Sequence, residues 1–423
     1  MNISDSEVAV SILKKNNYSF TDNPERADVI LVNTCSVREN AEVRVRGRLN
    51  AFKPLKKKKP KLIVGVIGCM AERMKETLFK EEAVVNMIAG PDAYRNLPGL
   101  LEKAVNTADA IDTDLSDHET YSDIIPHRTG NKLSAFISIM RGCNNYCSYC
   151  IVPYVRGKER SRDYRSIIRE VEHLVDQGYS EVVLLGQNVN SYYWRDKEIV
   201  SFTRLLEMVA EVSPDLRVRF TTSHPKDMPD ETLEVIAKYD NICKHIHLPL
   251  QSGSTRILDM MNRKYSREMY VDRVRAIREI VPGCGLTTDV FTGFCSETAE
   301  DHQQTLSLME WAEYDFAYMF KYSERPGTYA AKYLKDDVPE KVKIQRLEEI
   351  IRLQKMLSEE SNKRDINKTF EVLVEGRSKK SENQLSGRTS NNKVVVFPKQ
   401  DYNPGDIIKV KITDYTSATL IGH

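Results

Sequence analysis

Through the first part of the chain, short apolar runs alternate with polar stretches of helical length. The runs cover 28–34, 61–67 and 84–90, and they are rich in Val and Ile. Runs of this length and composition are typical of strands buried on both faces of a parallel sheet. The pattern predicts an open α/β domain with helices between its strands.

A helix is predicted before the first of these strands. Ser4 and Glu7 have the spacing of a capping box, and Val8 and Ile12 follow at helical spacing. In a capping box each of the two side chains bonds to the other residue's backbone N–H, so we expect the helix to begin at Ser4.

The middle of the chain repeats a strand–helix pattern six times. The expected strands cover 133–140, 181–186, 217–222, 244–248, 285–294 and 314–322. Helical stretches separate them, and a long charged helix at 339–365 follows the last. Repeated βα units of this kind predict a curved parallel sheet, here an incomplete barrel with its active site on the loops after the strands.

The end of the chain changes character. Short β-branched runs at 370–375, 393–397 and 407–412 are separated by turn residues and predict a small β-barrel. Residues 362–423 hold 11 Lys and Arg against 7 Asp and Glu, a mild indication of contact with RNA, although on charge alone a merely solvated barrel surface is the favoured reading. The acidic segment at 109–123 is predicted to connect the first domain to the second. We therefore expect domains at 1–122, 123–360 and 361–423.

Charge and composition narrow the class of protein only slightly. The formal net charge is +1, so any surface for nucleic acid must come from local segregation of charge. No secretory signal opens the chain, and no apolar stretch approaches the ~20 residues of a membrane span. Eight cysteines without an export signal indicate reduced thiols or metal ligands, and hence a cytoplasmic protein.

Three of those cysteines carry the strongest chemical signal. Cys143, Cys147 and Cys150 have the spacing C-x3-C-x2-C, directly after the first strand of the expected barrel. Three thiolates can ligate three irons of a 4Fe–4S cluster and leave the fourth iron open to a substrate or cofactor. A structural zinc site would need a fourth ligand that the neighbouring sequence does not offer.

Two more cysteines follow strands of the first sheet. Cys35 comes directly after one strand, and Cys69 follows the next after a glycine. Because ligands of open parallel sheets gather beyond the carboxyl ends of the strands, both thiols are expected to face one crevice. An equally simple reading makes them buried small hydrophobes.

With these motifs the chain resembles the radical S-adenosylmethionine methylthiotransferases. The resemblance lies in the run 141–162 around the triad, in Asn-Thr-Cys ending at Cys35, in Gly-Cys-Met around Cys69, and in a terminal barrel similar to a TRAM domain. It implies S-adenosylmethionine and two 4Fe–4S clusters, one on the triad and an auxiliary one that includes Cys35 and Cys69. The chemistry implied is replacement of an unactivated C–H bond by a methylthio group.

The sequence is most similar to the tRNA branch of that family. This branch adds the methylthio group to C2 of isopentenyladenosine beside the anticodon. Related branches act on threonylcarbamoyladenosine in tRNA or on a ribosomal-protein aspartate. A different class, a non-catalytic iron–sulfur RNA-binding protein, stays open. The branch implies a tRNA anticodon stem-loop as partner, an electron donor such as flavodoxin or ferredoxin, no membrane, and a monomer.

Further site residues are expected on the loops after the barrel strands and on the terminal barrel. Residues expected to contact the cofactor are Gly186, Gln187, Ser223, Gln251 and Gly293. Basic residues expected to neutralise RNA phosphates are Arg156, Lys158, Arg160, Arg162, Arg388 and Lys393.

At its beginning the chain departs from the family's pattern. Family members carry Thr-Tyr-Gly-Cys-Gln-Met-Asn after a first strand, and Met1-Asn2 matches the end of that motif. The first strand and the first auxiliary-cluster cysteine are then missing, which favours a longer natural product. Cys35 and Cys69 alone should hold the auxiliary cluster poorly.

Overall fold

A computed structural model describes residues 1–36, 39–106, 109–128, 130 and 132–423. The first of its two units comprises Met1–Gly130, Ser138–Tyr146 and Cys150–Ser166. The second comprises Asn131–Ile137, Cys147–Tyr149 and Ile167–His423. Within the described residues, no helix is both long and apolar enough to span a membrane.

The first unit contains a parallel sheet in the order β1-β2-β3-β4. Its strands are β1 (Val29–Thr34), β2 (Ile63–Gly68), β3 (Met87–Ala89) and β4 (Ala110–Asp112). The first three confirm the predicted strands. β4 lies inside the stretch expected to be a connector. It escaped the sequence analysis because an acidic strand of three residues has too little apolar pattern to stand out.

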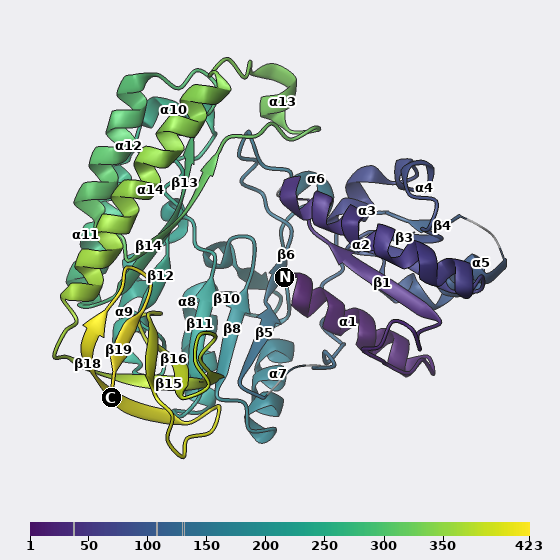
Figure 1. Cartoon of the computed structure of the whole chain (residues 1–423), viewed down its shortest axis with the longest axis horizontal. Helices are drawn as coiled ribbons and strands as arrows, with labels where there is room; N and C mark the ends of the chain where they lie inside the picture. Colours follow the sequence, from purple (N-terminus) through teal and green to yellow (C-terminus); the bar gives the residue numbers. More distant parts are fainter. Residues whose placement is uncertain (37–38, 107–108, 129, 131) are drawn as a thin grey trace. The chain divides into compact units, whose positions relative to one another are not determined.

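Helices cover both faces of this sheet (Figure 1). On one face lie α1 (Asn2–Lys15) and α5 (Leu97–Asn106), and on the other α2 (Glu39–Lys58), α3 (Cys69–Met74) and α4 (Thr77–Glu81). The alternation of β2 divides its side chains between the two cores. Ile63 and Ile67 pack with α1 and α5, whereas Val64 and Val66 pack with α2 and α3.

The predicted capping box is wrong. Helix α1 begins at Asn2, and no side chain caps it. The backbone N–H of Asp5 already bonds to the carbonyl of Met1 at 2.8 Å, so Ser4 lies within the first turn. The carboxylate of Glu7 forms an ion pair with Arg128 instead of reaching back to the helix start.

Three short elements complete the first unit around the cysteine loop. Strands β6 (Met140–Arg141) and β7 (Arg160–Ser161) form an antiparallel pair, and α6 (Val152–Arg156) lies between them in sequence. A 3-10 turn, η1 (Tyr94–Asn96), precedes α5.

The second unit contains the six predicted parallel strands. They form two sheets, β11-β8-β5 and β12-β13-β14, which a parallel bridge between Val218 and Ile242 connects. Their bounds are β5 (Ser134–Ser138), β8 (Glu181–Leu185), β11 (Arg217–Thr221), β12 (His245–His247), β13 (Gly285–Thr292) and β14 (Phe316–Lys321). The incomplete barrel is confirmed.

Helices follow these strands as the pattern predicted. They are α7 (Tyr164–Asp176), α8 (Phe202–Val212), α9 (Asp230–Lys238), α10 (Thr255–Met260), α11 (Arg267–Ile280), α12 (Ala299–Ala312), α13 (Tyr329–Tyr333) and α14 (Glu340–Lys363). The smaller elements are η2 (Val189–Ser191), β9 (Tyr193–Arg195), β10 (Ile199–Ser201) and η3 (Pro225–Asp227).

The predicted terminal barrel is also confirmed. It is closed in the order β15-β16-β17-β19-β18 around an apolar core. Its strands are β15 (Thr369–Arg377), β16 (Gln384–Thr389), β17 (Val394–Pro398), β18 (Ile407–Tyr415) and β19 (Leu420–Gly422).

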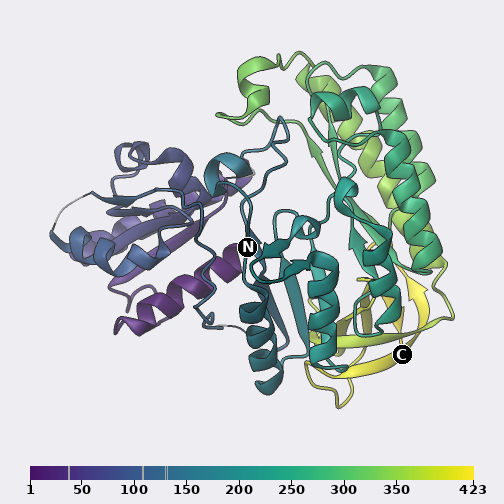
Figure 2. The same ribbon diagram turned by 180° about the vertical axis from the view of Figure 1, so that it is seen from behind.

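Within the second unit, this barrel packs at the N-terminal ends of the parallel strands (Figure 2). Arg217, the first residue of β11, donates to the carbonyl of Arg388 at 2.8 Å, and Arg219 donates to that of Thr389 at 2.7 Å. At Gly285 a side chain would lie only 2.3 Å from the carbonyl of Asn391. The terminal barrel therefore occupies the end of the sheet opposite to the loops that follow the strands.

Candidate active site

The loop that carries the cysteine triad has a fixed beginning. Gly142 has φ +72, and a Cβ there would lie 2.0 Å from the carbonyl oxygen of Lys158. Only glycine combines that conformation with that close approach. Directly afterwards, the N–H of Cys143 donates to the carbonyl of Gly157 at 3.3 Å. Cys143 and Cys147 are buried, and Cys150 is half-buried.

The middle of the loop, Cys147–Tyr149, is held by hydrogen bonds within the second unit. The N–H of Ser148 donates to Met261 O at 3.0 Å, and its hydroxyl donates to Met260 O at 2.8 Å. The carbonyl of Ser148 accepts from the N–H of Ala330 at 2.7 Å. The backbone between Cys147 and Tyr149 is therefore fixed against the end of α10.

A buried arginine contacts the central cysteine. Arg263 is 5% exposed, and its Nη1 lies 3.3 Å from Cys147 Sγ. Its Nε donates to the hydroxyl of Tyr265 at 3.3 Å, and that hydroxyl donates to Leu250 O at 2.8 Å. Arg263 Nη2 is buried without a hydrogen-bond partner in the described structure. A cation placed in this way suits an anionic group beside Cys147.

Loops after the parallel strands contribute further buried polar atoms that lack partners among the described residues. These atoms are Asn188 Oδ1 after β8, Ser223 Oγ and His224 Nε2 after β11, and Gln251 Oε1 after β12. Buried polar groups in native proteins are rarely left without a hydrogen bond, so these atoms fit a polar ligand at the carboxyl ends of the strands. Burial, with Arg263 nearby, lowers the pKa of His224 to about 2, so its ring is neutral.

The residues expected to contact the cofactor differ in their surroundings. Ser223 and Gln251 belong to this set of buried atoms without partners. Gly186 is buried and continues the sheet, since its N–H donates to Thr221 O at 3.2 Å, and Gln187 is half-buried beside it.

Gly293 lies in a tight turn against α14. It has φ +68, and a Cβ on it would lie 2.3 Å from the side chain of Lys343 in α14. Its N–H donates to Glu297 Oε1 at 2.8 Å. A side chain would have no room here, so the tight turn against α14 explains the glycine, and its expected contact with an adenine ring stays a prediction.

The two cysteines of the first unit lie at the carboxyl ends of paired strands. Thr34, just before Cys35, pairs with Gly68, just before Cys69. The Thr34 hydroxyl donates to Ile67 O at 2.7 Å and accepts from the N–H of Met70 at 3.2 Å. Both backbones thus end at one edge of the sheet, as the order of strands predicted. Cys69 is buried and Cys35 half-buried.

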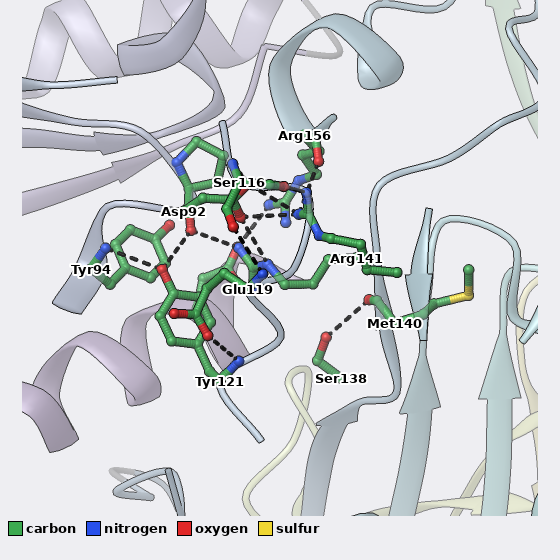
Figure 3. Close-up of polar contacts among 12 residues, drawn as sticks. Asp92, Tyr94, Ser116, Glu119, Tyr121, Ser138, Met140, Arg141 and Arg156 are labelled. Carbon is green, nitrogen blue, oxygen red and sulfur yellow. Dashed lines mark hydrogen bonds and ion pairs between the residues drawn. The ribbon is translucent and has the colours of Figure 1, made fainter. Parts of the chain in front are cut away.

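A buried ion cluster surrounds Cys69. Arg156 is 3% exposed; its Nε donates to Cys69 Sγ at 3.1 Å, and its guanidinium pairs with Asp5 at 2.7 Å. Arg141 pairs with Asp5 at 2.8 Å and lies over the ring of Tyr121 (Figure 3). Although burial raises the pKa of Asp5, Arg156 and Arg141 hold it at about 2.

The structure contradicts the expected RNA contacts of three arginines. Arg156, Arg160 and Arg162 are buried, and each donates hydrogen bonds to groups inside the first unit. Arg160 pairs with Asp92 at 3.0 Å, and Arg162 donates to the Ser166 hydroxyl at 2.8 Å. A guanidinium that already neutralises a buried carboxylate or bonds to a buried hydroxyl cannot also bind an external phosphate.

The other basic residues divide by exposure. Lys158 has a side chain that is 69% exposed, with Asp117 at 3.7 Å, so it can reach a phosphate. Lys393 is less available to a phosphate, because its ammonium pairs with Asp365 at 2.6 Å and donates to the Ser361 hydroxyl at 2.7 Å. Arg388 is partly exposed and pairs with Glu375 at 3.0 Å.

The described residues contain no group of three or more His, Cys, Asp or Glu side chains gathered around one point. The fit of the triad to an iron–sulfur cluster therefore comes from its spacing and from the buried cation beside Cys147. Sequence reasoning missed Arg263 and Asp5, because neither belongs to a recognisable motif. The sequence did hold one signal for the ion cluster: Arg141, which pairs with Asp5, directly precedes the cysteine loop.

Comparisons with known proteins agree along the chain. The Radical SAM superfamily matches residues 137–309, the Uncharacterized protein family UPF0004 residues 1–90, and the TRAM domain residues 363–423. Two relatives called tRNA-2-methylthio-N(6)-dimethylallyladenosine synthase, from Bacteroides thetaiotaomicron and Porphyromonas gingivalis, are 60% and 56% identical. Both are matched over 100% of this chain, and over 93% and 92% of their own lengths.

The chain belongs to the radical S-adenosylmethionine methylthiotransferase family.

Solved structures of more distant enzymes share the fold of this methylthiotransferase. TsrM from Kitasatospora setae, a radical S-adenosylmethionine methyltransferase, is 14% identical with a TM-score of 0.59 over 77% of this chain and 73% of that one. The cobalamin-dependent enzyme OxsB is 12% identical with a TM-score of 0.54 over 82% of this chain and 54% of that one. At these identities the likeness shows the fold alone.

Proposed function

We propose that this methylthiotransferase acts on tRNA and converts N6-isopentenyladenosine beside the anticodon to its 2-methylthio form. The observation that carries the proposal is identity of 56–60% over the whole chain to proteins named for that product. The terminal TRAM domain and the exposed Lys158 also suit an RNA substrate.

In this proposal Cys143, Cys147 and Cys150 hold a 4Fe–4S cluster, and S-adenosylmethionine lies against it. When bound, such a cluster supplies the one-electron chemistry needed to remove hydrogen from an unactivated carbon, which acid–base groups cannot do. Ser223, Gln251 and their neighbours after the strands would donate to or accept from the polar groups of S-adenosylmethionine, since their buried atoms need partners.

Two exposed aromatic side chains on one face of β14 suit an unpaired base. Phe316 and Tyr318 alternate with the buried Ala317 along β14, and they are 45% and 49% exposed. The ring of His247, on β12, meets Tyr318 edge to face at 5.9 Å. Exposed aromatic rings are the surfaces on which proteins stack unpaired RNA bases, so an adenine turned out of its loop could lie here.

Cys35 and Cys69 would ligate the auxiliary cluster that we propose as the site of the sulfur. The domain bounds 1–122, 123–360 and 361–423, a flavodoxin or ferredoxin as electron donor, a monomeric state and a cytoplasmic location stay predictions.

Nucleoside mass spectrometry of tRNA from a strain that lacks this gene, beside its parent, tests the proposal. We expect 2-methylthio-isopentenyladenosine to disappear and isopentenyladenosine to accumulate. Restoration of the gene should reverse both changes, whereas a Cys147→Ala gene should not. An unchanged profile would reject this substrate, and the threonylcarbamoyl nucleoside and ribosomal-protein aspartate should then be measured in the same strains.

A further inference from the structure

The buried charge of Arg263 lacks the kind of compensation that other buried arginines have. Within the second unit, Arg219 and Arg346 pair with the carboxylates of Glu181 and Glu297. Arg217 donates to two backbone carbonyls. Among the described residues no carboxylate lies within ion-pair distance of Arg263. Its hydrogen-bond partners are the sulfur of Cys147 and the hydroxyls of Tyr149 and Tyr265.

Burial of a cation without an anion is strongly unfavourable, because the lost hydration is not replaced. The thiol and the two phenol groups are neutral when protonated, so they supply dipoles but no charge. The site therefore favours a bound anion, and Cys147 is where that anion would lie. Iron–sulfur clusters held by thiolates carry net negative charge, and each added electron increases it.

We propose that Arg263 is a positioning residue that supplies the counter-charge of the triad cluster and raises its reduction potential. Its Nη1 donates to the ligating sulfur of Cys147, and its charge stabilises the reduced cluster more than the oxidised one. Net charge and hydrogen bonds to sulfur are the levers by which proteins set the potentials of such clusters. This inference rests on the proposed binding of a cluster by the triad.

The position of Arg263 is determined by the fold of the second unit. The backbone N–H of Arg263 bonds to Leu258 O at 2.9 Å, which fixes the residue just after α10. The Tyr265 hydroxyl, itself bonded to Pro249 O and Leu250 O, accepts from Nε and holds the guanidinium from behind. The same end of α10 binds Ser148, so the arginine and the cysteine share one support.

An electron paramagnetic resonance titration of the anaerobically reconstituted full chain tests this. A Cys35→Ala, Cys69→Ala background leaves only the triad cluster to be titrated. Arg263→Met should move the midpoint potential to a more negative value, and Arg263→Lys should stay near the parent because it keeps the charge. Arg275→Met, which removes an arginine with a 60% exposed side chain, is the matched control and should leave the potential unchanged.

Circular dichroism and iron content show which variants fold and bind a cluster. If Arg263→Met does not load, Arg263→Gln takes its place in the comparison with Arg263→Lys. The inference is overturned if a loaded neutral variant has the parental potential, or if the lysine variant shifts as far as the neutral one. Absence of a cluster from the parent would instead overturn the proposed function.

Discussion

Each of the two units places a buried guanidinium on a cysteine sulfur, but the two arginines differ in charge balance. In the first unit, Arg156 contacts Cys69 at 3.1 Å and pairs with Asp5 at 2.7 Å. In the second, Arg263 contacts Cys147 at 3.3 Å and has no carboxylate beside it among the described residues. The difference separates an arginine whose charge is already used by the fold from one whose charge is left for a ligand.

The largest effects should come from the cysteines themselves. Cys147→Ala should abolish both cleavage of S-adenosylmethionine and methylthiolation, because an open-iron cluster needs all three thiolates. Cys69→Ala should abolish methylthiolation but keep the cleavage. Assays of 5′-deoxyadenosine and of methylthiolated RNA separate these results. Cys284→Ala, at a half-buried cysteine just before β13 that belongs to neither cysteine motif, should affect neither, and loss of cleavage in Cys69→Ala would contradict the division of roles.

Removal of Asp5 should be the next largest effect, and it acts on stability. Asp5→Asn leaves Arg141 and Arg156 buried with one carboxylate fewer, and we expect a loss of about 3–5 kcal/mol in the free energy of unfolding of the first unit. Chemical denaturation measures it. Asp117→Asn is the control: Asp117 is exposed, so its change should stay within about 0.5 kcal/mol. Equal losses of unfolding free energy in Asp5→Asn and Asp117→Asn would contradict a structural role of the ion cluster.

The pH dependence of stability provides a second check of Asp5. Its pKa falls from the usual 3.8 to about 2, so its contribution is complete above about pH 4 and disappears as the pH falls through 2. A shift of this size corresponds to about 2 kcal/mol. The parent should therefore lose stability in this window relative to Asp5→Asn. A constant difference between the two proteins across the window would contradict the low pKa.

A smaller effect should distinguish exposed from buried basic residues in the first unit. Lys158→Ala should weaken binding of an anticodon stem-loop and reduce the salt dependence by about one phosphate contact, without a change in stability. Arg160→Ala should instead destabilise the fold, since it removes one of the two arginines that pair with the buried Asp92. Binding titrations at several salt concentrations measure the affinity for RNA, and thermal melts of both variants measure stability. An unchanged salt slope in Lys158→Ala would place the RNA elsewhere.

The smallest effect concerns the hydroxyl that supports Arg263. Tyr265→Phe removes the acceptor behind Arg263 and should cost about 1 kcal/mol of stability together with a small negative shift of the cluster potential. Tyr121→Phe, which removes a hydroxyl bonded to Pro91 O and the N–H of Tyr94, should have a similar cost but no effect on the potential. Identical cluster reduction potentials in the two variants would show that Tyr265 does not act on the cluster through Arg263.

Most of the fold was predictable because its signals are local. Strands β1 and β2 are formed by largely apolar runs, and β13 is rich in β-branched residues. β4 was missed because its three residues resemble the acidic loop around them. The start of α1 was misplaced because the capping motif at Ser4 competes with a turn that already begins at Asn2.

The sequence by itself determined the thiol spacing of the triad, the order of strands that brings Cys35 and Cys69 to one edge, and the closed terminal barrel. All of these depend on neighbours along the chain or on the periodicity of strands. Only the tertiary structure decided which basic residues are available to RNA. Arg156 and Asp5 are separated by 151 positions, and Arg160 and Asp92 by 68. A basic run in sequence carries no record of partners so distant, because burial and charge pairing arise only when the elements pack.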